Sequence, residues 1–166
     1  MDITVEDGSG VAGANSYISI ADAKAWASSR GLTFPTVDAD VEKVLLSAMD
    51  YLESLRAQYS GSKSDPANPL QWPRQKATLD GVLILPTVIP TELKSAQVQL
   101  AYEAQTTELQ PTGSGQEVAS EQVDVLNVSY FKRGLSTVQP QFNKALAFLQ
   151  PLLKTGGAFG VRTVRV

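Results

Sequence analysis

The 166-residue chain contains no histidine and no cysteine, and these two absences exclude several classes of chemistry. Without cysteine, the chain can form neither a disulfide framework nor a thiolate metal site. Without histidine, it cannot use a Ser-His-Asp triad, a histidine-ligated zinc ion or the usual general base near neutral pH. We therefore expect a protein that is not an enzyme and that uses no cofactor or metal.

Long apolar runs and excess positive charge are also missing. No run of 18 or more apolar residues is present, so we expect no membrane span. The acidic start of the chain, Met1–Asp7, lacks the features of a signal peptide. The net charge of −3 and the pI of about 4.9 argue against a broad phosphate-neutralising surface. With 43% apolar and 19% charged residues, the composition is that of one globular domain, or of a small domain with arms.

Chemical motifs are scarce as well. We find no glycine-rich phosphate loop, dinucleotide fingerprint, HExxH motif or nucleophile elbow. Residues 6–10 contain two carboxylates and two glycines, but they lack the ligand spacing of a calcium loop, so we expect a simple turn. Lys132 and Arg133 beside Tyr130 and Phe131 could bind single-stranded nucleic acid. They are equally explained as the end of a strand with core aromatics, which is the interpretation we favour.

The first half of the chain predicts two helices. Ser19 is a suitable N-cap for a helix over residues 20–30 that buries Trp26 and ends at Gly31. Apolar residues then recur at helical spacing over residues 39–59, with Asp38 or Asp40 as the cap. The short run Ile3–Val5 alternates like a strand.

The second half predicts two more helices and a β element. Thr91 can cap a helix running to Glu108 that is apolar on two sides, so this helix is either central in the domain or also touches a neighbouring molecule. Residues 118–131 are rich in β-formers, with a bulge or hairpin at Val125–Leu126. A last helix begins near Gln139–Pro140 and is ended or kinked by Pro151.

The loop Leu70–Arg74 stands out because it places a tryptophan in a proline-rich connection. Trp72 is either a plug at the end of the core, with Arg74 as a solvated neighbour, or part of a surface presented to a partner; we favour the plug. The apolar run Val82–Leu85 follows an Asp-Gly turn signal at Asp80 and Gly81.

The C-terminal residues 155–166 change from glycine-rich to alternating valine and arginine. This alternation predicts a strand that adds either to the protein's own sheet or to the edge of another chain, and we favour the second. The predicted fold class is mainly α (α+β). The predicted organisation is a helical domain over residues 1–154, with a β element around 117–131, followed by an extended arm over 155–166.

Four stretches together resemble a known family. They are residues 5–10 with 14–19, residues 48–52, Leu70–Arg74 with Asp80-Gly81, and Ile89-Pro90 at the start of a helix. The set is similar to the tailed-phage head–tail connector proteins, also called adaptor or head-completion proteins, some of which carry the label DnaT-like single-stranded DNA-binding protein.

This resemblance implies a structural virion protein with a four-helix-type domain, a small β-hairpin and a C-terminal arm. Its copies would form a ring, commonly dodecameric, that joins the portal to the neck or tail. Double-stranded DNA would pass through this ring without specific binding during genome packaging and ejection. The expected location is the virion neck, after synthesis in the bacterial host cytoplasm. The expected portal-docking residues are Val161, Arg162, Val164, Arg165 and Val166, and the expected ring or structural contacts are Trp72, Pro73, Arg74, Val98, Tyr102 and Leu109.

Two other functions stay open. A single-stranded DNA-binding accessory protein would use Tyr130, Lys132 and Arg133 as DNA contacts. An enzyme that uses carboxylates and a metal is a third possibility, for which the sequence shows no site.

Overall fold

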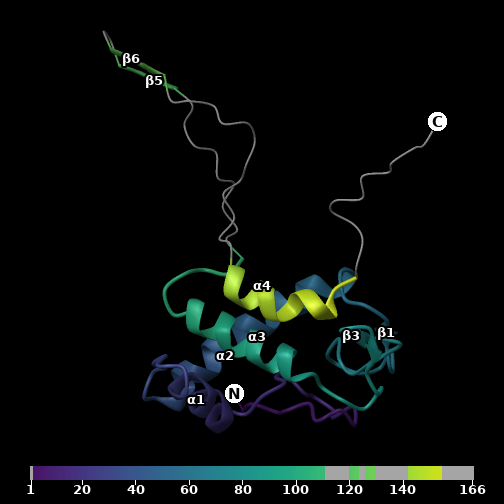
Figure 1. Ribbon diagram of the computed structural model, residues 1–166. Coiled ribbons are helices and arrows are strands. Elements are labelled where there is room, and N and C mark those ends of the chain that lie inside the picture. Colours follow the sequence, from purple (N-terminus) through teal and green to yellow (C-terminus); the bar gives the residue numbers. More distant parts are fainter. Residues whose placement is uncertain (1, 111–119, 124–125, 130–141, 155–166) are drawn as a thin grey trace, which may run out of the picture. The chain divides into compact units, whose positions relative to one another are not determined.

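The computed structural model describes residues 2–110, 120–123, 126–129 and 142–154 (Figure 1). These residues divide into two compact units. The larger one, the helical unit, is built from residues 2–109 and 142–154, and the smaller one lies within Gln110–Gln141. The mainly α (α+β) class predicted from the sequence is confirmed.

The helix at the centre of the helical unit is α3, which packs against the other three α-helices and lies between α2 and α4 (Figure 1). Most of its side chains are buried, including the polar Ser95, Gln97 and Gln99. Of the two explanations for its two apolar sides, a central position is the one that the structure shows. Among the described residues the α-helices are α1 (Ile20–Ser28), α2 (Asp38–Ser54), α3 (Thr91–Glu103) and α4 (Asn143–Leu149).

Gln97 connects the centre of α3 to the N-terminal segment. Its Nε2 donates to Ser16 Oγ at 2.8 Å, and its Oε1 accepts from the Tyr17 N–H at 3.0 Å. The side chain is fully buried. Because both ends of its amide have partners, this polar group fixes the position of the N-terminal segment on α3 without an unpaired donor or acceptor.

The first helix begins at Ile20 as predicted, but it ends at Ser28, before the predicted residue 30, and its tryptophan is less buried than predicted. Ser19 Oγ accepts from the Asp22 N–H at 3.1 Å, and Gly31 follows the helix with a φ of 69°. Trp26, however, is only partly buried, so the prediction of a core tryptophan in α1 is wrong. Its ring packs on the outside of α3, where it remains partly accessible.

The predicted caps of α2 and α3 are wrong. Val37 precedes α2 and Pro90 precedes α3, and neither helix start has a side-chain capping bond. Asp38, Asp40 and Thr91 instead lie inside the first turns. There the two carboxylates interact favourably with the positive end of the α2 dipole.

The second helix also ends earlier than predicted. After α2 the chain tightens into a 3₁₀ turn, η1 (Leu55–Ala57), and Tyr59 leaves the helix. Tyr59 forms a β-bridge with Leu153, and its hydroxyl donates to Leu52 O at 3.1 Å. Tertiary contacts at Tyr59 therefore replace the last helical turn that its spacing predicts. Likewise, α3 ends at Glu103 and does not reach the predicted 108.

The last helix is followed by η2 (Gln150–Leu152), in which Pro151 ends the α-helical hydrogen bonding as predicted. Its predicted start at residues 139–140 lies outside the described residues. No helix in the described ranges is both long enough and apolar enough to cross a membrane.

Strand structure in the described residues consists of three short antiparallel pairs. The strand predicted at Ile3–Val5 forms only a single bridge, between Val5 and Ser16. Within the predicted β-rich segment the structure shows a hairpin and not a bulge. The pairs are β1 (Ser62–Lys63) with β2 (Arg74–Gln75), β3 (Thr78–Leu79) with β4 (Val82–Leu83), and β5 (Ser120–Val123) with β6 (Leu126–Ser129).

The predicted turn at residues 6–10 is organised by a buried carboxylate. Glu6 is fully buried and accepts hydrogen bonds from the backbone N–H groups of Gly8, Gly10 and Val11 at 2.8 to 2.9 Å. These three donors satisfy the charge that would otherwise be costly to bury. In the described part of the chain, no group of three or more acidic side chains could hold a metal ion.

Gly8→Ala is expected to destabilise the protein much more than Gly13→Ala. Both glycines have positive φ, +107° and +73°, so both substitutions carry backbone strain of about 1 kcal/mol. Only at Gly8 would the new Cβ lie 1.8 Å from Thr87 O, whereas nothing lies within 4 Å at Gly13. Urea denaturation measures the difference in the free energy of unfolding. Equal losses in the two variants would contradict the close packing of this loop against Thr87.

Candidate functional site

Trp72 lies in the loop that connects α2 to α3. It is fully buried, and its ring packs edge-to-face against Tyr59, with ring centroids 6.0 Å apart. Its backbone N–H donates to Tyr17 Oη at 3.1 Å, and the peptide bond to Pro73 is cis. This position agrees with the interpretation of Trp72 as a plug at the end of the core.

Glu53 connects the Trp72 loop to α2. Its Oε1 accepts from Tyr17 Oη at 3.1 Å and from the Gln71 N–H at 3.0 Å. Burial, assisted by the charge of Glu53, raises the pKa of Tyr17 well above its usual value, and the same two causes raise the pKa of Tyr59. Both hydroxyls therefore stay protonated and act as hydrogen-bond donors.

Arg74 is buried, and its prediction as a solvated neighbour is wrong. Only 5% of the residue is exposed, its Nε donates to Ser60 O at 2.8 Å, and its Nη2 donates to Gly61 O at 2.9 Å. Burial lowers the pKa of Arg74, and nearby Tyr59 opposes that change. These bonds fasten β2 to the turn that precedes β1. Arg74 thus shapes its own loop and is covered from a partner.

The three ring-contact residues predicted on or after α3 differ in their surroundings. Val98 and Leu109 are buried inside the helical unit, so their contacts are with their own chain. Tyr102 is partly exposed and is the one of these three that a partner could reach. It lines a shallow recess of about 180 Å³ together with Thr33, Gln105 and Thr106.

The other predicted site residues lie outside the described residues. They are the portal-docking residues Val161, Arg162, Val164, Arg165 and Val166, and the alternative DNA contacts Tyr130, Lys132 and Arg133.

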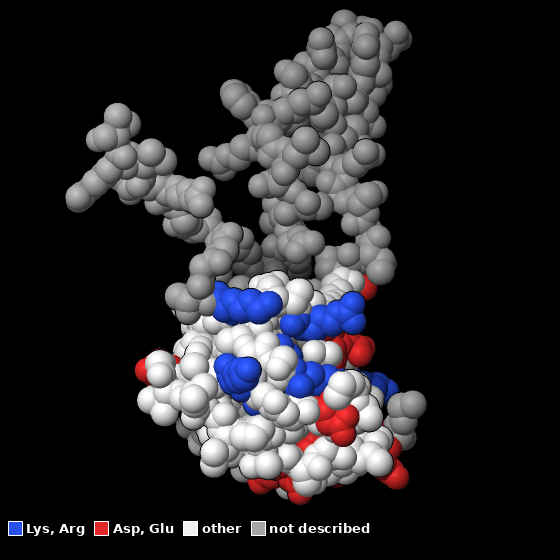
Figure 2. Space-filling model, turned by 90° about the vertical axis from the view of Figure 1, so that its right-hand side faces the viewer, with Lys and Arg blue, Asp and Glu red and all other residues white. Residues whose placement is uncertain are grey.

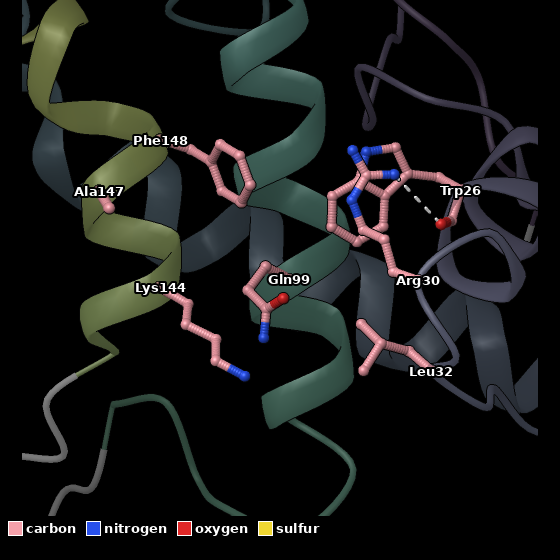
Figure 3. A pocket seen from close by; sticks show the side chains of 7 residues that line it. All are labelled: Trp26, Arg30, Leu32, Gln99, Lys144, Ala147 and Phe148. Atoms are coloured by element: carbon pink, nitrogen blue, oxygen red, sulfur yellow. Dashed lines mark hydrogen bonds between the residues drawn. The ribbon is translucent and has the colours of Figure 1, made fainter.

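A larger hollow, which we call the aromatic cleft, lies where α1, α3 and α4 meet (Figure 3). Its volume is about 380 Å³. In Figure 3, the Phe148 ring from α4 and the Trp26 side chain from α1 approach each other across α3, which supplies Gln99 next to them. The lining residues are Trp26, Arg30, Leu32, Gln99, Lys144, Ala147 and Phe148.

The side chains of the aromatic cleft hold one another in place. The rings of Trp26 and Phe148 are 6.1 Å apart at 71°, an edge-to-face pair. The Arg30 guanidinium lies 3.8 Å from the centre of the Trp26 ring, which is close enough for a cation–π interaction. Trp26 Nε1 donates to Ser95 Oγ of α3 at 3.1 Å. The rings are therefore oriented before any ligand binds.

Sequence reasoning missed this cleft, although a signal for it was present. Trp26 and Arg30 are four residues apart in and just after α1, and Lys144 and Phe148 are four residues apart in α4. Side chains at this spacing share one helix face, so each helix presents one aromatic ring and one cation together. Such a lining can receive an apolar or planar group that lies next to a negative charge.

Charges on another face of the helical unit are mixed. Figure 2 shows the side that lies to the right in Figure 1, with Lys and Arg in separate patches in its upper part and Asp and Glu mainly below. Uncharged surface lies between the patches. Acidic residues also outnumber basic ones in the described part of the chain. This face is therefore not a continuous basic groove.

Raising the pH above about 10 is expected to destabilise the fold through Tyr17 and Tyr59. In the unfolded chain both hydroxyls ionise near pH 10, whereas in the folded chain their raised pKa values keep them protonated. The unfolded state then binds fewer protons, so the free energy of unfolding falls by about 1.4 kcal/mol per pH unit for each tyrosine. Urea midpoints measured at a series of alkaline pH values give this slope. Tyr17→Phe should reduce it, and an unchanged slope in that variant would contradict the prediction.

Comparison with known proteins identifies the family of this chain. A family model described as "Putative DnaT-like ssDNA binding protein" matches residues 1–166. No curated protein and no solved structure matches the chain. Because the family model covers the whole sequence, the chain belongs to this DnaT-like family.

Proposed function

We propose that the protein is a structural component of a phage virion, an adaptor ring that joins the portal to the neck or tail and lines the DNA exit channel. In this proposal the protein has no catalytic role, cofactor or membrane contact. Its partners are the portal, a downstream neck or tail-completion protein and further copies of itself. It acts in the virion neck after synthesis in the host cytoplasm.

The observation that carries this proposal is an exposed apolar surface on the helical unit. Val82, Leu83 and Leu85, which we call the apolar ridge, are 69%, 69% and 67% exposed. They follow a tight turn at Asp80 and Gly81, whose φ values of 50° and 82° are typical of a two-residue hairpin. Val82 and Leu83 are consecutive in β4 (Val82–Leu83), so the hairpin exposes large aliphatic side chains on both of its faces. Exposed apolar surface of this kind marks protein–protein contacts.

The hairpin of β5 and β6 also supports an assembled protein. Within the described residues, these two strands pair only with each other. A two-stranded hairpin is marginally stable by itself in water and gains stability when a neighbour packs against it. An adaptor ring supplies such neighbours, because each copy lies between two others and between two further components.

The charge of the chain suits a conduit for DNA. The net charge is −3, and acidic residues are in excess in the described part. A protein that neutralises few phosphates binds DNA weakly at physiological salt. Such a ring lets the genome slide past, as a channel between capsid and tail requires.

Mixing the protein with the portal ring from the same genome is expected to give extra density stacked on the portal in electron micrographs. Deletion of residues 157–166 is expected to abolish this density, because the proposed docking arm contains Val161–Val166. The matched control is Gly13→Ala, which leaves the arm intact. A bare portal at high concentration of the full-length protein would contradict direct docking.

Single-stranded DNA binding is a second candidate function, and the residue types that line the aromatic cleft support it. The cleft combines two aromatic rings, Trp26 and Phe148, with the cations of Arg30 and Lys144. Stacking of bases on aromatic rings together with phosphate neutralisation is the usual way in which proteins hold single strands. The description of the family points in the same direction.

Under the adaptor proposal, we expect negligible affinity for a labelled oligothymidine at physiological salt, measured by fluorescence anisotropy. Under the second function, binding would weaken steeply as salt rises, and Trp26→Ala or Lys144→Ala would reduce it. Substitution of Tyr130, Lys132 and Arg133 by alanine tests the alternative DNA contacts separately. Salt-sensitive binding that any of these variants abolishes would replace the adaptor proposal with the second function.

A further inference from the structure

The apolar ridge and the aromatic cleft are built from different elements of the helical unit. The ridge belongs to the β3–β4 hairpin, on the right in Figure 1, where β3 contacts η2. The cleft is lined by residues in or next to α1, α3 and α4, of which α1 lies on the left in the same view. A single copy therefore presents a projecting apolar hairpin and, built from other elements, an apolar hollow.

We propose that the apolar ridge of one copy inserts into the aromatic cleft of the next copy of this chain. The inference rests on the proposed function, because it names the contact by which adaptor copies join into a ring. Two different surfaces that meet head to tail form a heterologous interface, and repetition of that interface closes into a ring when the rotation permits.

The apolar parts of the two surfaces fit one another. The ridge offers aliphatic side chains at Val82, Leu83 and Leu85, and the cleft offers the rings of Trp26 and Phe148 around about 380 Å³. A volume of this size lies at the lower end of the range for binding pockets and has room for more than one aliphatic side chain. Insertion would remove from water part of the most exposed large apolar surface of the helical unit.

The charges at the edges of the two surfaces are complementary as well. Asp80 stands exposed at the turn before the ridge, and the cleft carries Arg30 and Lys144, which are both exposed. Lys76 is exposed just before β3 and carries a positive charge. In the cleft, Gln99 donates to the carboxylate of Glu103 at 2.9 Å, so a negative charge lies next to the cleft. Pairing of opposite charges at an interface selects the partner and fixes its register.

The geometry of the cleft favours this occupant over a nucleic acid. Arg30 already covers one face of the Trp26 ring, at 3.8 Å. The rings of Trp26 and Phe148 meet at 71°, so they do not form parallel walls between which a base could stack. An aliphatic side chain, by contrast, packs well against an edge-to-face pair.

Cysteine trapping tests the proposed contact directly, because the natural chain contains no cysteine. One sample carries only Leu83→Cys and the other only Ala147→Cys, which lies in the cleft lining. On mild oxidation at high protein concentration, we expect the mixture to form a disulfide-linked dimer of one copy of each, identified by mass spectrometry. Replacing the second sample by Ser47→Cys, an exposed position on α2, is the matched control and should give at least tenfold less dimer.

A double-mutant cycle tests the charge pairing without disturbing the hairpin. Lys144→Glu in the cleft copy is expected to slow cross-linking by about tenfold, since it places a carboxylate opposite Asp80. Asp80→Asn in the ridge copy keeps a residue that tolerates positive φ, and it should remove most of the effect of Lys144→Glu. Independent effects of the two substitutions would contradict the pairing.

The outcomes separate this inference from the proposed function. Portal density without the Leu83–Ala147 cross-link would overturn the contact and leave the adaptor role in place. The cross-link without portal density would support the contact and contradict the adaptor role. Equal cross-linking to Ser47→Cys would overturn the contact. Oligonucleotide binding that Lys144→Glu abolishes would also overturn it and would assign the cleft to nucleic acid.

Discussion

The carboxylate of Glu53 links the parts of the helical unit that have the least regular structure. It lies near the end of α2 and accepts from the Tyr17 hydroxyl and from the backbone of the Trp72 loop. Tyr17 in turn accepts from the Trp72 N–H. One acidic side chain thus joins the N-terminal segment, α2 and the long loop, and partly buried hydrogen bonds of this kind are costly to leave unmade.

This linkage determines what the surface can present. Because Trp72 is buried and Arg74 is bonded to Ser60 O and Gly61 O, the loop is anchored at its base. The β3–β4 hairpin that follows can then project Val82 and Leu83 into solvent without loosening the core. The prediction of Arg74 as a solvated residue was wrong because its neighbours in the sequence do not show which backbone carbonyl groups the fold brings next to it.

The central position of α3 has a similar consequence for the surface around the aromatic cleft. Because α3 packs against α1, α2 and α4, most of its side chains are buried within the unit. The exposed and partly exposed side chains around the aromatic cleft therefore lie in or next to α1 and α4. A ring built from such units would use peripheral surfaces and keep the helical core unchanged in every copy.

The sequence by itself determined the fold class, the existence and order of the helices, the Ser19 cap, the end of the last α-helix at Pro151 and the burial of Trp72. These follow from periodicity, proline geometry and the cost of exposing a large aromatic ring, which are local properties. Only the tertiary structure decided that Trp26 is partly exposed, that Arg74 is buried and that Tyr59 leaves its helix to meet Leu153. The aromatic cleft belongs to this second group, because α1 and α4 are separated by more than a hundred residues and their side chains meet only when both helices pack on α3.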